Sequence, residues 1–190
     1  MYDFGSDEYG TNYRDLLEKR LESEGKPYIF LTPEWCAAYE TLVQNDERYK
    51  QVARNWEGSV VLVFQADEVS RMGGDLFVYL DLWHGECRWL KPVPEAKGRE
   101  GDYVLEAEYG RWERIVKGEL NVVKELATRQ LKLVPFDFKK AVKLAAASQA
   151  AIRLVELAGK VETRFPGTLD SSGLVSLKEF FSKLRSDFGI

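Results

Sequence analysis

Residues 76–83 constrain the fold more than any other segment, because large aliphatic side chains recur there at every second position. The aliphatic positions are Leu76, Val78, Leu80 and Leu82, and the intervening ones include Tyr79, Asp81 and Trp83. A period of two places these sets on opposite faces of an extended backbone. The segment is therefore predicted to be a β-strand that buries one face, so a sheet must lie at the centre of the fold.

Four further segments have the composition of strands: residues 59–66, 87–91, 103–109 and 131–134. The tight turn His84-Gly85-Glu86 connects the strand at 76–83 to the next one, and a glycine-containing turn at 67–74 connects it to the one before. Short connections favour antiparallel pairing. With helical segments before and after, the chain is predicted to be an α+β domain with a five-stranded, mainly antiparallel sheet covered by helices.

Helical spacing of apolar residues predicts helices at 11–24, 33–44, 47–56, 120–127, 137–159 and 175–188, and a short one around Trp112. Thr32 and Asp137 are suitable N-caps for two of them, and Pro33 stands in a first turn, where proline is tolerated. The helix at 137–159 carries two apolar stripes, so it needs cover on two sides. We expect the sheet to cover one stripe, and a ligand or the C-terminal segment to cover the other.

The pattern divides the chain into three parts. Residues 1–30 form an N-terminal extension with a short helix, of which 1–10 are expected to be mobile. Residues 31–165 form the main domain, and 166–190 form a linker and a C-terminal amphipathic helix. The apolar face of that helix carries Leu177, Phe180, Phe181, Leu184 and Phe188. We expect it to dock as a lid over a ligand site, as completion of the core, or as a homodimer contact with a second copy.

The charge of the chain is uneven. Its 27 basic and 31 acidic residues give a net charge of −4, which argues against general nucleic-acid binding. Residues 111–143, however, contain nine basic and four acidic side chains. This stretch is either an ordinary solvated surface or a part that attracts an anionic membrane or lipid headgroup. In the second case, the expected partners of an anionic head are Arg129, Lys139, Lys140 and Lys143.

No set of residues has the spacing of a catalytic or metal site. His84 is the only histidine, it lies in a predicted turn, and no acid is placed to orient it beside Cys87. Asp81 is expected to pair with a basic side chain on an adjacent strand. One histidine and two separated cysteines do not make a tetrahedral zinc site. We therefore expect no enzyme activity and no cofactor. Without a signal peptide or a membrane span, a cytoplasmic, reduced protein is expected.

The order of elements and several short motifs resemble the sterol carrier protein-2 family over residues 30–165. The matching positions are Trp56-Glu57-Gly58, residues 80–85, residues 102–104, Trp112, the linker Gly118-Glu119-Leu120-Asn121, Ala127 and Leu131-Lys132-Leu133. These are packing and turn positions, and none is a catalytic signature. Arg129-Gln130 and Pro135-Phe136 depart from the family pattern, which commonly has a small residue before the last strand and a glycine after it. Ligand size and the route of access therefore do not follow from the resemblance.

The resemblance implies an intracellular domain that binds a fatty acid, acyl-CoA, sterol or isoprenoid-type lipid in an apolar tunnel between sheet and helices, and performs no chemistry. A carrier of this kind should contain a continuous apolar cavity of about 300 Å³ or more. Composition alone does not distinguish residues that fill a core from residues that line a tunnel. The residues expected to line it are Val78, Leu80, Leu82, Trp112, Ile115, Leu120, Val123, Leu126, Leu133, Phe136, Phe138, Val142 and Ala145.

Two other roles remain open from the sequence. The resemblance also allows an accessory or assembly module that presents a lipid or quinone-type substrate to a partner enzyme, as related domains do in isoprenoid-quinone synthesis. The C-terminal helix would then dock that partner. A hydrolase is the third possibility, and it requires a function for His84. Co-purified lipid would favour the carrier, and an empty protein in a stable complex would favour the module.

Overall fold

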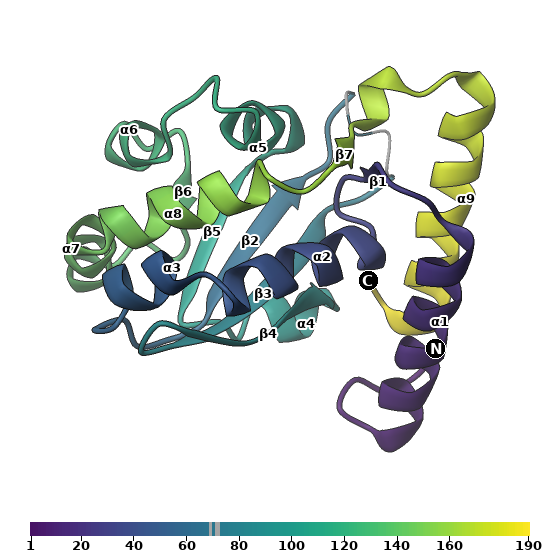
Figure 1. Ribbon diagram of the computed structural model, residues 1–190, viewed down its shortest axis with the longest axis horizontal. Coiled ribbons are helices and arrows are strands. Elements are labelled where there is room, and N and C mark those ends of the chain that lie inside the picture. Colours follow the sequence, from purple (N-terminus) through teal and green to yellow (C-terminus); the bar gives the residue numbers. More distant parts are fainter. Residues whose placement is uncertain (69, 71–72) are drawn as a thin grey trace.

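The structure is a computed structural model that describes residues 1–68, 70 and 73–190 (Figure 1). Its main sheet has five strands in the order β4-β3-β2-β5-β6. The strands are β2 (Val60–Gln65), β3 (Leu76–Trp83), β4 (Glu86–Val93), β5 (Tyr103–Glu108) and β6 (Lys132–Leu133). All five predicted strands are therefore confirmed. The turn expected at 67–74 includes residues 69 and 71–72, which lie outside the described part of the chain.

The sheet is mixed but mostly antiparallel, as predicted. β3 pairs antiparallel with both β2 and β4, and β6 pairs antiparallel with β5. Among the described strand pairs of this sheet, only β2 and β5 run parallel. The parallel pair arises because the chain leaves β4, passes through α4 (Glu95–Gly98) and returns on the far side of β2. The connection between β4 and β5 thus contains a short helix.

A layer of helices covers one face of the sheet (Figure 1). Its members are α2 (Pro33–Gln44), α3 (Glu47–Val52), α5 (Tyr109–Val116), α6 (Val122–Ala127) and α8 (Ser148–Ala158). The face beneath this layer carries Val78, Leu80 and Leu82, as the alternation predicted. The opposite face carries Phe77 and Tyr79, which pack against α4 and the segments next to it.

The turn between β3 and β4 holds the hairpin against α3. His84 (φ 48°) and Gly85 (φ 83°) both have positive φ, which is the conformation of a type I′ turn. A Cβ atom at Gly85 would lie 2.4 Å from the carbonyl oxygen of Lys50 and 2.8 Å from its Cα atom. Glycine is therefore required there both by the backbone conformation and by the close approach of α3.

The helix predicted over residues 137–159 is two helices in the structure. α7 (Phe138–Ala146) ends and α8 begins at Ala147, whose backbone (φ −90°, ψ 17°) is not helical. Asp137 caps α7, as predicted, by accepting a hydrogen bond from the backbone N–H of Lys140. The break occurs in a run of alanines, so helix propensity gave no signal for it. α8 packs into the core, whereas no side chain of α7 is buried.

The two ends of the chain form a second layer beside the domain. α1 (Asp7–Ser23) and α9 (Ser171–Phe188) lie side by side at one end of the molecule (Figure 1). Phe188 packs edge-on against Tyr9 and Tyr13, with ring centroids 5.3 and 5.7 Å apart. Ser6 caps α1, and the first turn of this helix occupies residues 7–10, which were expected to be mobile. That expectation overlooked the capping serine and the two acidic residues after it.

A short connection ties this layer to the domain. β1 (Tyr28–Ile29) and β7 (Thr163–Arg164) form a two-stranded parallel sheet, and the 3₁₀ helix η1 (Pro166–Thr168) leads from β7 towards α9. Arg20 of α1 pairs with Glu34 of α2 at 2.5 Å and lies 4.1 Å from the ring centroid of Phe180 of α9. One arginine therefore joins three helices.

Candidate apolar ligand site

An apolar void of about 100 Å³ lies between the sheet and the helical layer, and most of its lining residues are buried. All of its lining residues are aliphatic or aromatic. They are Phe30, Leu31, Trp35, Tyr39, Tyr49, Trp56, Val60, Leu62, Phe64, Val78, Leu80, Leu82, Leu105, Trp112, Ile115, Val116, Val122, Leu126, Leu131, Leu144, Ala147, Ala150, Ala151, Leu154, Val155 and Ala158. The strands supply one wall, and α2, α5, α6 and α8 supply most of the other.

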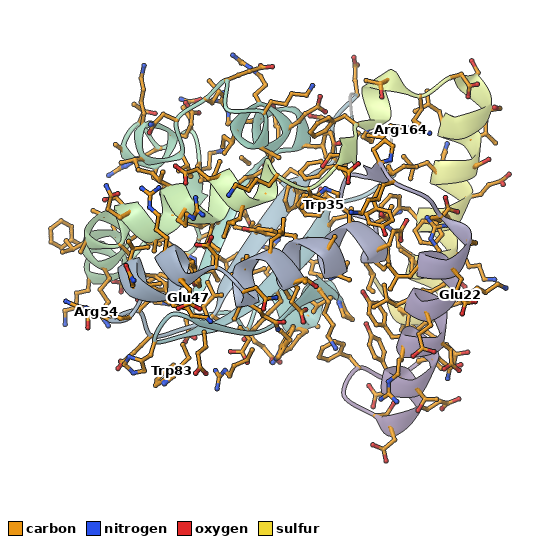
Figure 2. The ribbon with its side chains drawn as sticks, in the orientation of Figure 1. Glu22, Trp35, Glu47, Arg54, Trp83 and Arg164 are labelled. Atoms are coloured by element: carbon orange, nitrogen blue, oxygen red, sulfur yellow. The ribbon has the colours of Figure 1, made fainter. Side chains whose placement is uncertain are left out.

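Three of the aromatic lining residues donate hydrogen bonds to other parts of the chain. The indole N–H of Trp112 donates to the carbonyl of Val63 at 2.9 Å, and the hydroxyl of Tyr39 donates to the carbonyl of Leu154 at 3.0 Å. Trp35, which lies in the interior (Figure 2), donates to the hydroxyl of Thr163 at 2.8 Å. These donors are satisfied by the protein itself, so the void presents ring and hydrocarbon surface to any occupant.

Among the described residues, the structure does not show the expected tunnel. The void is about a third of the smallest size expected. An empty apolar void of about 100 Å³ destabilises a core by roughly 2 kcal/mol, at about 24 cal/mol per Å³. The interior is thus mostly packed but retains a defect that an apolar group would fill.

An open groove of about 370 Å³ lies beside this void, between α6, β6 and α7. Its lining is Val123, Leu126, Ala127, Arg129, Leu131, Leu133, Phe136, Phe138, Ala141, Leu144, Ala145 and Ser148. Leu126, Leu131 and Leu144 line both the groove and the void. These three leucines therefore form the partition between the interior and an apolar surface that is open to solvent.

Eleven of the thirteen predicted ligand-binding residues line one of these two spaces. The void contains Val78, Leu80, Leu82, Trp112, Ile115 and Leu126. The groove contains Val123, Leu133, Phe136, Phe138 and Ala145, together with Leu126 again. Leu120 lines neither space and packs against the core, and Val142 is exposed on α7. Whether a ligand contacts these residues remains a prediction.

Sequence reasoning missed part of the lining. The second apolar stripe of the predicted long helix lines the void, and the pattern did signal that one of the two stripes required cover by a ligand or the C-terminal segment. Its members are Leu144, Ala147, Ala151, Leu154 and Ala158. Phe30 and Leu31 were also missed; they come from the short apolar run before α2. They were not named as lining residues, because filling and lining use the same residue types.

The basic residues that were expected to meet an anionic head lie around the groove. Arg129 lines it, with its guanidinium 4.9 Å from the ring centroid of Phe136. Lys139 and Lys143 are exposed on α7. The ammonium group of Lys140 donates to the backbone carbonyl of Asp102 at 2.5 Å, so this lysine is held against the sheet. Three of the four basic residues thus remain accessible to an anion.

The candidate catalytic residues have structural contacts instead. The ring nitrogens of His84 face the carbonyl oxygen of Arg54 at 2.8 Å and a carboxylate oxygen of Glu57 at 3.2 Å. Burial raises the pKa of the Cys87 thiol to about 12, which keeps it protonated and a poor nucleophile. Asp81 pairs with Arg88 on the neighbouring strand at 2.6 Å, as predicted.

Residues 1–68, 70 and 73–190 contain neither a candidate membrane span nor a candidate metal site. None of the helices they form has the length and apolar character needed to cross a membrane. Nor do three or more of their His, Cys, Asp and Glu side chains gather in a group able to hold a metal ion.

At the rim of the molecule, the side chain of Trp83 projects outwards into solvent (Figure 2).

The structure is similar to two solved structures over most of their length. A crystal structure of sterol carrier protein 2 matches with a TM-score of 0.62 and 34% identity, covering 70% of this chain and 98% of that one. A solution structure from Thermus thermophilus, described as possibly a sterol carrier protein, matches with a TM-score of 0.63 and 33% identity, covering 75% and 96%. Comparisons with models of protein families and with curated proteins give no match.

A mixed five-stranded sheet with one helical layer and an apolar interior defines an α+β domain of the sterol-carrier type. Because the first relative is 34% identical and is covered over 98% of its length, the chain belongs to the sterol carrier protein-2 family. The resemblance seen in the sequence is thereby confirmed.

Proposed function

We propose that this protein is a non-catalytic lipid carrier that binds a fatty acid, acyl-CoA, sterol or isoprenoid-type lipid between the sheet and the helical layer. The observation that carries the proposal is the apolar void, which shares Leu126, Leu131 and Leu144 with the neighbouring groove. The description of the related structures as sterol carrier protein supports the same function.

Apolar burial supplies the driving force for uptake. Each methylene group that leaves water contributes about 0.8 kcal/mol. Filling the void also recovers the roughly 2 kcal/mol that an empty one costs. Since sites for drug-sized ligands measure about 300–1,000 Å³, the 100 Å³ void holds only part of a lipid and must join the groove, which adds about 370 Å³.

Displacement of α7 would join the two spaces. This helix buries no side chain, and 74% of Phe138 is exposed. Its C-terminal end meets α8 at the non-helical residue Ala147, which can act as a hinge. An outward movement of α7 would carry Leu144 away from Leu126 and Leu131, and the partition between groove and void would open.

The contacts of α9 favour a carrier over a module that docks a partner enzyme. Leu177, Phe181, Leu184 and Phe188 are buried within the chain, so the face that would dock a partner is already covered. The proposal includes no chemistry, since the single histidine faces a backbone carbonyl and Glu57, and Cys87 is a buried thiol.

The substitution Ala151→Leu tests the site by adding bulk to the wall of the void. If it displaces about two methylene groups of the ligand, at about 0.8 kcal/mol each, the affinity should fall about tenfold. Folding should be retained, because the added atoms enter empty space. The measurement is a titration of delipidated protein with a fluorescent fatty acid, together with the melting temperature.

Ala146→Leu is the matched control, because Ala146 is exposed on α7 and lines neither space. Its affinity should equal that of the unmodified protein. An equal loss in both variants would contradict the proposed site. Absence of saturable binding of fatty acid, sterol and isoprenoid alcohol to the unmodified, delipidated protein would contradict the proposed function.

A further inference from the structure

Three large apolar side chains are exposed close together beside the groove. Phe136, Phe138 and Val142 have 57%, 74% and 52% of their surface exposed. Phe138 and Val142 are four positions apart on α7, so they share one face of that helix. Both phenylalanines also line the groove. A contiguous apolar cluster of this kind in water marks an interaction surface.

A basic row runs alongside this apolar row. Lys139 and Lys143 are also four positions apart, and each follows its apolar neighbour by one residue, which is about 100° around the helix. Both are exposed. α7 therefore presents an apolar row and a basic row next to each other, the arrangement of a helix that lies in a membrane interface.

The cations around the groove are left uncompensated, whereas those of α5 are paired. Arg111, Arg114 and Lys117 each pair with a glutamate of the segment 111–143. Asp137, the fourth acidic residue of that segment, caps α7. Among the described residues, no carboxylate pairs with the other cations of the segment, which are Lys124, Arg129, Lys132, Lys139, Lys140 and Lys143. The excess positive charge is thus concentrated on α6, β6 and α7, the elements that form the groove.

We propose that α7 and the residues before it dock the protein on an anionic lipid bilayer, with the groove facing the membrane. Lysine and arginine side chains reach phosphate groups from flexible apolar stems, while Phe136 and Phe138 reach the acyl boundary. A lipid that leaves the bilayer then enters the groove next to Leu126 and Leu131 without crossing water. The docking itself does not depend on the proposed carrier function. Only the transfer of lipid from the bilayer into the groove rests on that function.

Vesicle flotation of the full chain tests the docking. Vesicles of phosphatidylcholine mixed with phosphatidylglycerol should bind the protein, and vesicles of phosphatidylcholine alone should not. Raising the salt concentration should release it, because screening weakens surface attraction. The double substitution Lys139→Glu and Lys143→Glu should weaken binding at least about 30-fold. Phe138→Ser should weaken it about tenfold, with less dependence on salt.

Two variants on α9 are the matched controls. Lys178→Glu with Lys183→Glu makes the same change of charge on exposed lysines at the other end of the molecule, and Val175→Ser removes another exposed apolar side chain. Both should bind vesicles as the unmodified protein does. Equal losses in these controls, or equal binding to both kinds of vesicle, would overturn the docking surface.

The same samples separate the two proposals. A protein that binds the fluorescent fatty acid but floats with neither vesicle overturns the docking and leaves the carrier function intact. A protein that floats with anionic vesicles but binds no lipid probe overturns the carrier function and leaves the docking intact.

Discussion

Asp46 links two helices of the layer above the sheet. Its Oδ1 accepts the backbone N–H of Tyr49 at 2.7 Å, which caps α3. Arg153 of α8 reaches the same carboxylate with two nitrogens, at 2.9 Å to Oδ1 and 2.5 Å to Oδ2. Hydrogen bonding from Arg153 lowers the pKa of Asp46 from 3.8 to about 2. The two-point geometry makes this pair more specific than an ordinary surface ion pair.

The substitution Asp46→Asn should therefore make stability depend differently on pH. Asparagine retains the cap but not the ion pair. Because folding lowers this pKa, the pair stabilises the protein above about pH 4, and that contribution disappears as pH falls towards 2. The variant should melt below the unmodified protein at pH 7, and the gap should close between pH 4 and 2. A gap that stays constant over that range would refute the assignment, and Asp137→Asn, at a cap without an arginine, should show a smaller gap.

At the scale of single residues, the sequence predicted local pairing better than burial. The pairing of Asp81 with a neighbouring strand followed from its place in an alternating strand. Val142 was assigned to the ligand site because its stripe was taken to be buried, and it is exposed because α7 packs only loosely. Periodicity identifies the apolar face of a helix but not how closely that face approaches its neighbours.

The β3–β4 hairpin closely approaches α3, and Gly85→Ala tests this contact. The added Cβ atom combines a left-handed backbone with a clash against Lys50. We expect a loss of about 3 kcal/mol in the free energy of unfolding. Gly118→Ala isolates the backbone effect, because φ is 76° there and no atom lies within 4 Å of the new Cβ; about 1 kcal/mol should be lost. Urea denaturation of both variants measures the difference, and equal losses would exclude the clash.

The elements with strong local patterns were predictable, and those that depend on distant contacts were not. Strict alternation located β3, and Asp137 located the start of α7. β1 and β7 have two residues each and are 134 positions or more apart, so no local pattern predicts their pairing. No local pattern marks the break at Ala147, because the alanine-rich sequence around it favours a continuous helix. The size of the void likewise depends on how side chains interlock and not on which residue types are present.

Across the whole molecule, Arg20 holds the terminal layer to the domain. Only 1% of the Glu34 side chain is exposed, so Arg20→Leu would leave a buried carboxylate uncompensated. The expected loss is about 3 kcal/mol in the free energy of unfolding. The double variant with Glu34→Gln should recover most of it, because the charge is removed as well. Lys26→Met, which breaks an exposed pair with Glu162, should lose less than about 1 kcal/mol. A double variant no more stable than Arg20→Leu would contradict this account.

The position of α9 corrects one expectation about the whole molecule. A lid over the ligand site, formed by Phe180, Phe181 and Leu184, was one of the roles that the sequence left open for α9, but these residues line neither the void nor the groove. They pack in the terminal layer, at the opposite end of the molecule from α6 and α7 (Figure 1). Of the roles expected for this helix, completion of the core is the one that the structure shows.

Because the terminal layer and the groove lie at opposite ends of the molecule, the protein can be immobilised through its N-terminus (Figure 1). Met1 is 92% exposed and belongs to the terminal layer, far from the groove (Figure 1). A tether attached at Met1 would therefore hold the molecule on a sensor chip or bead with α7 turned outwards. Immobilised molecules would all present the same end to passing vesicles, so one orientation could be assayed without chemical labelling near the groove.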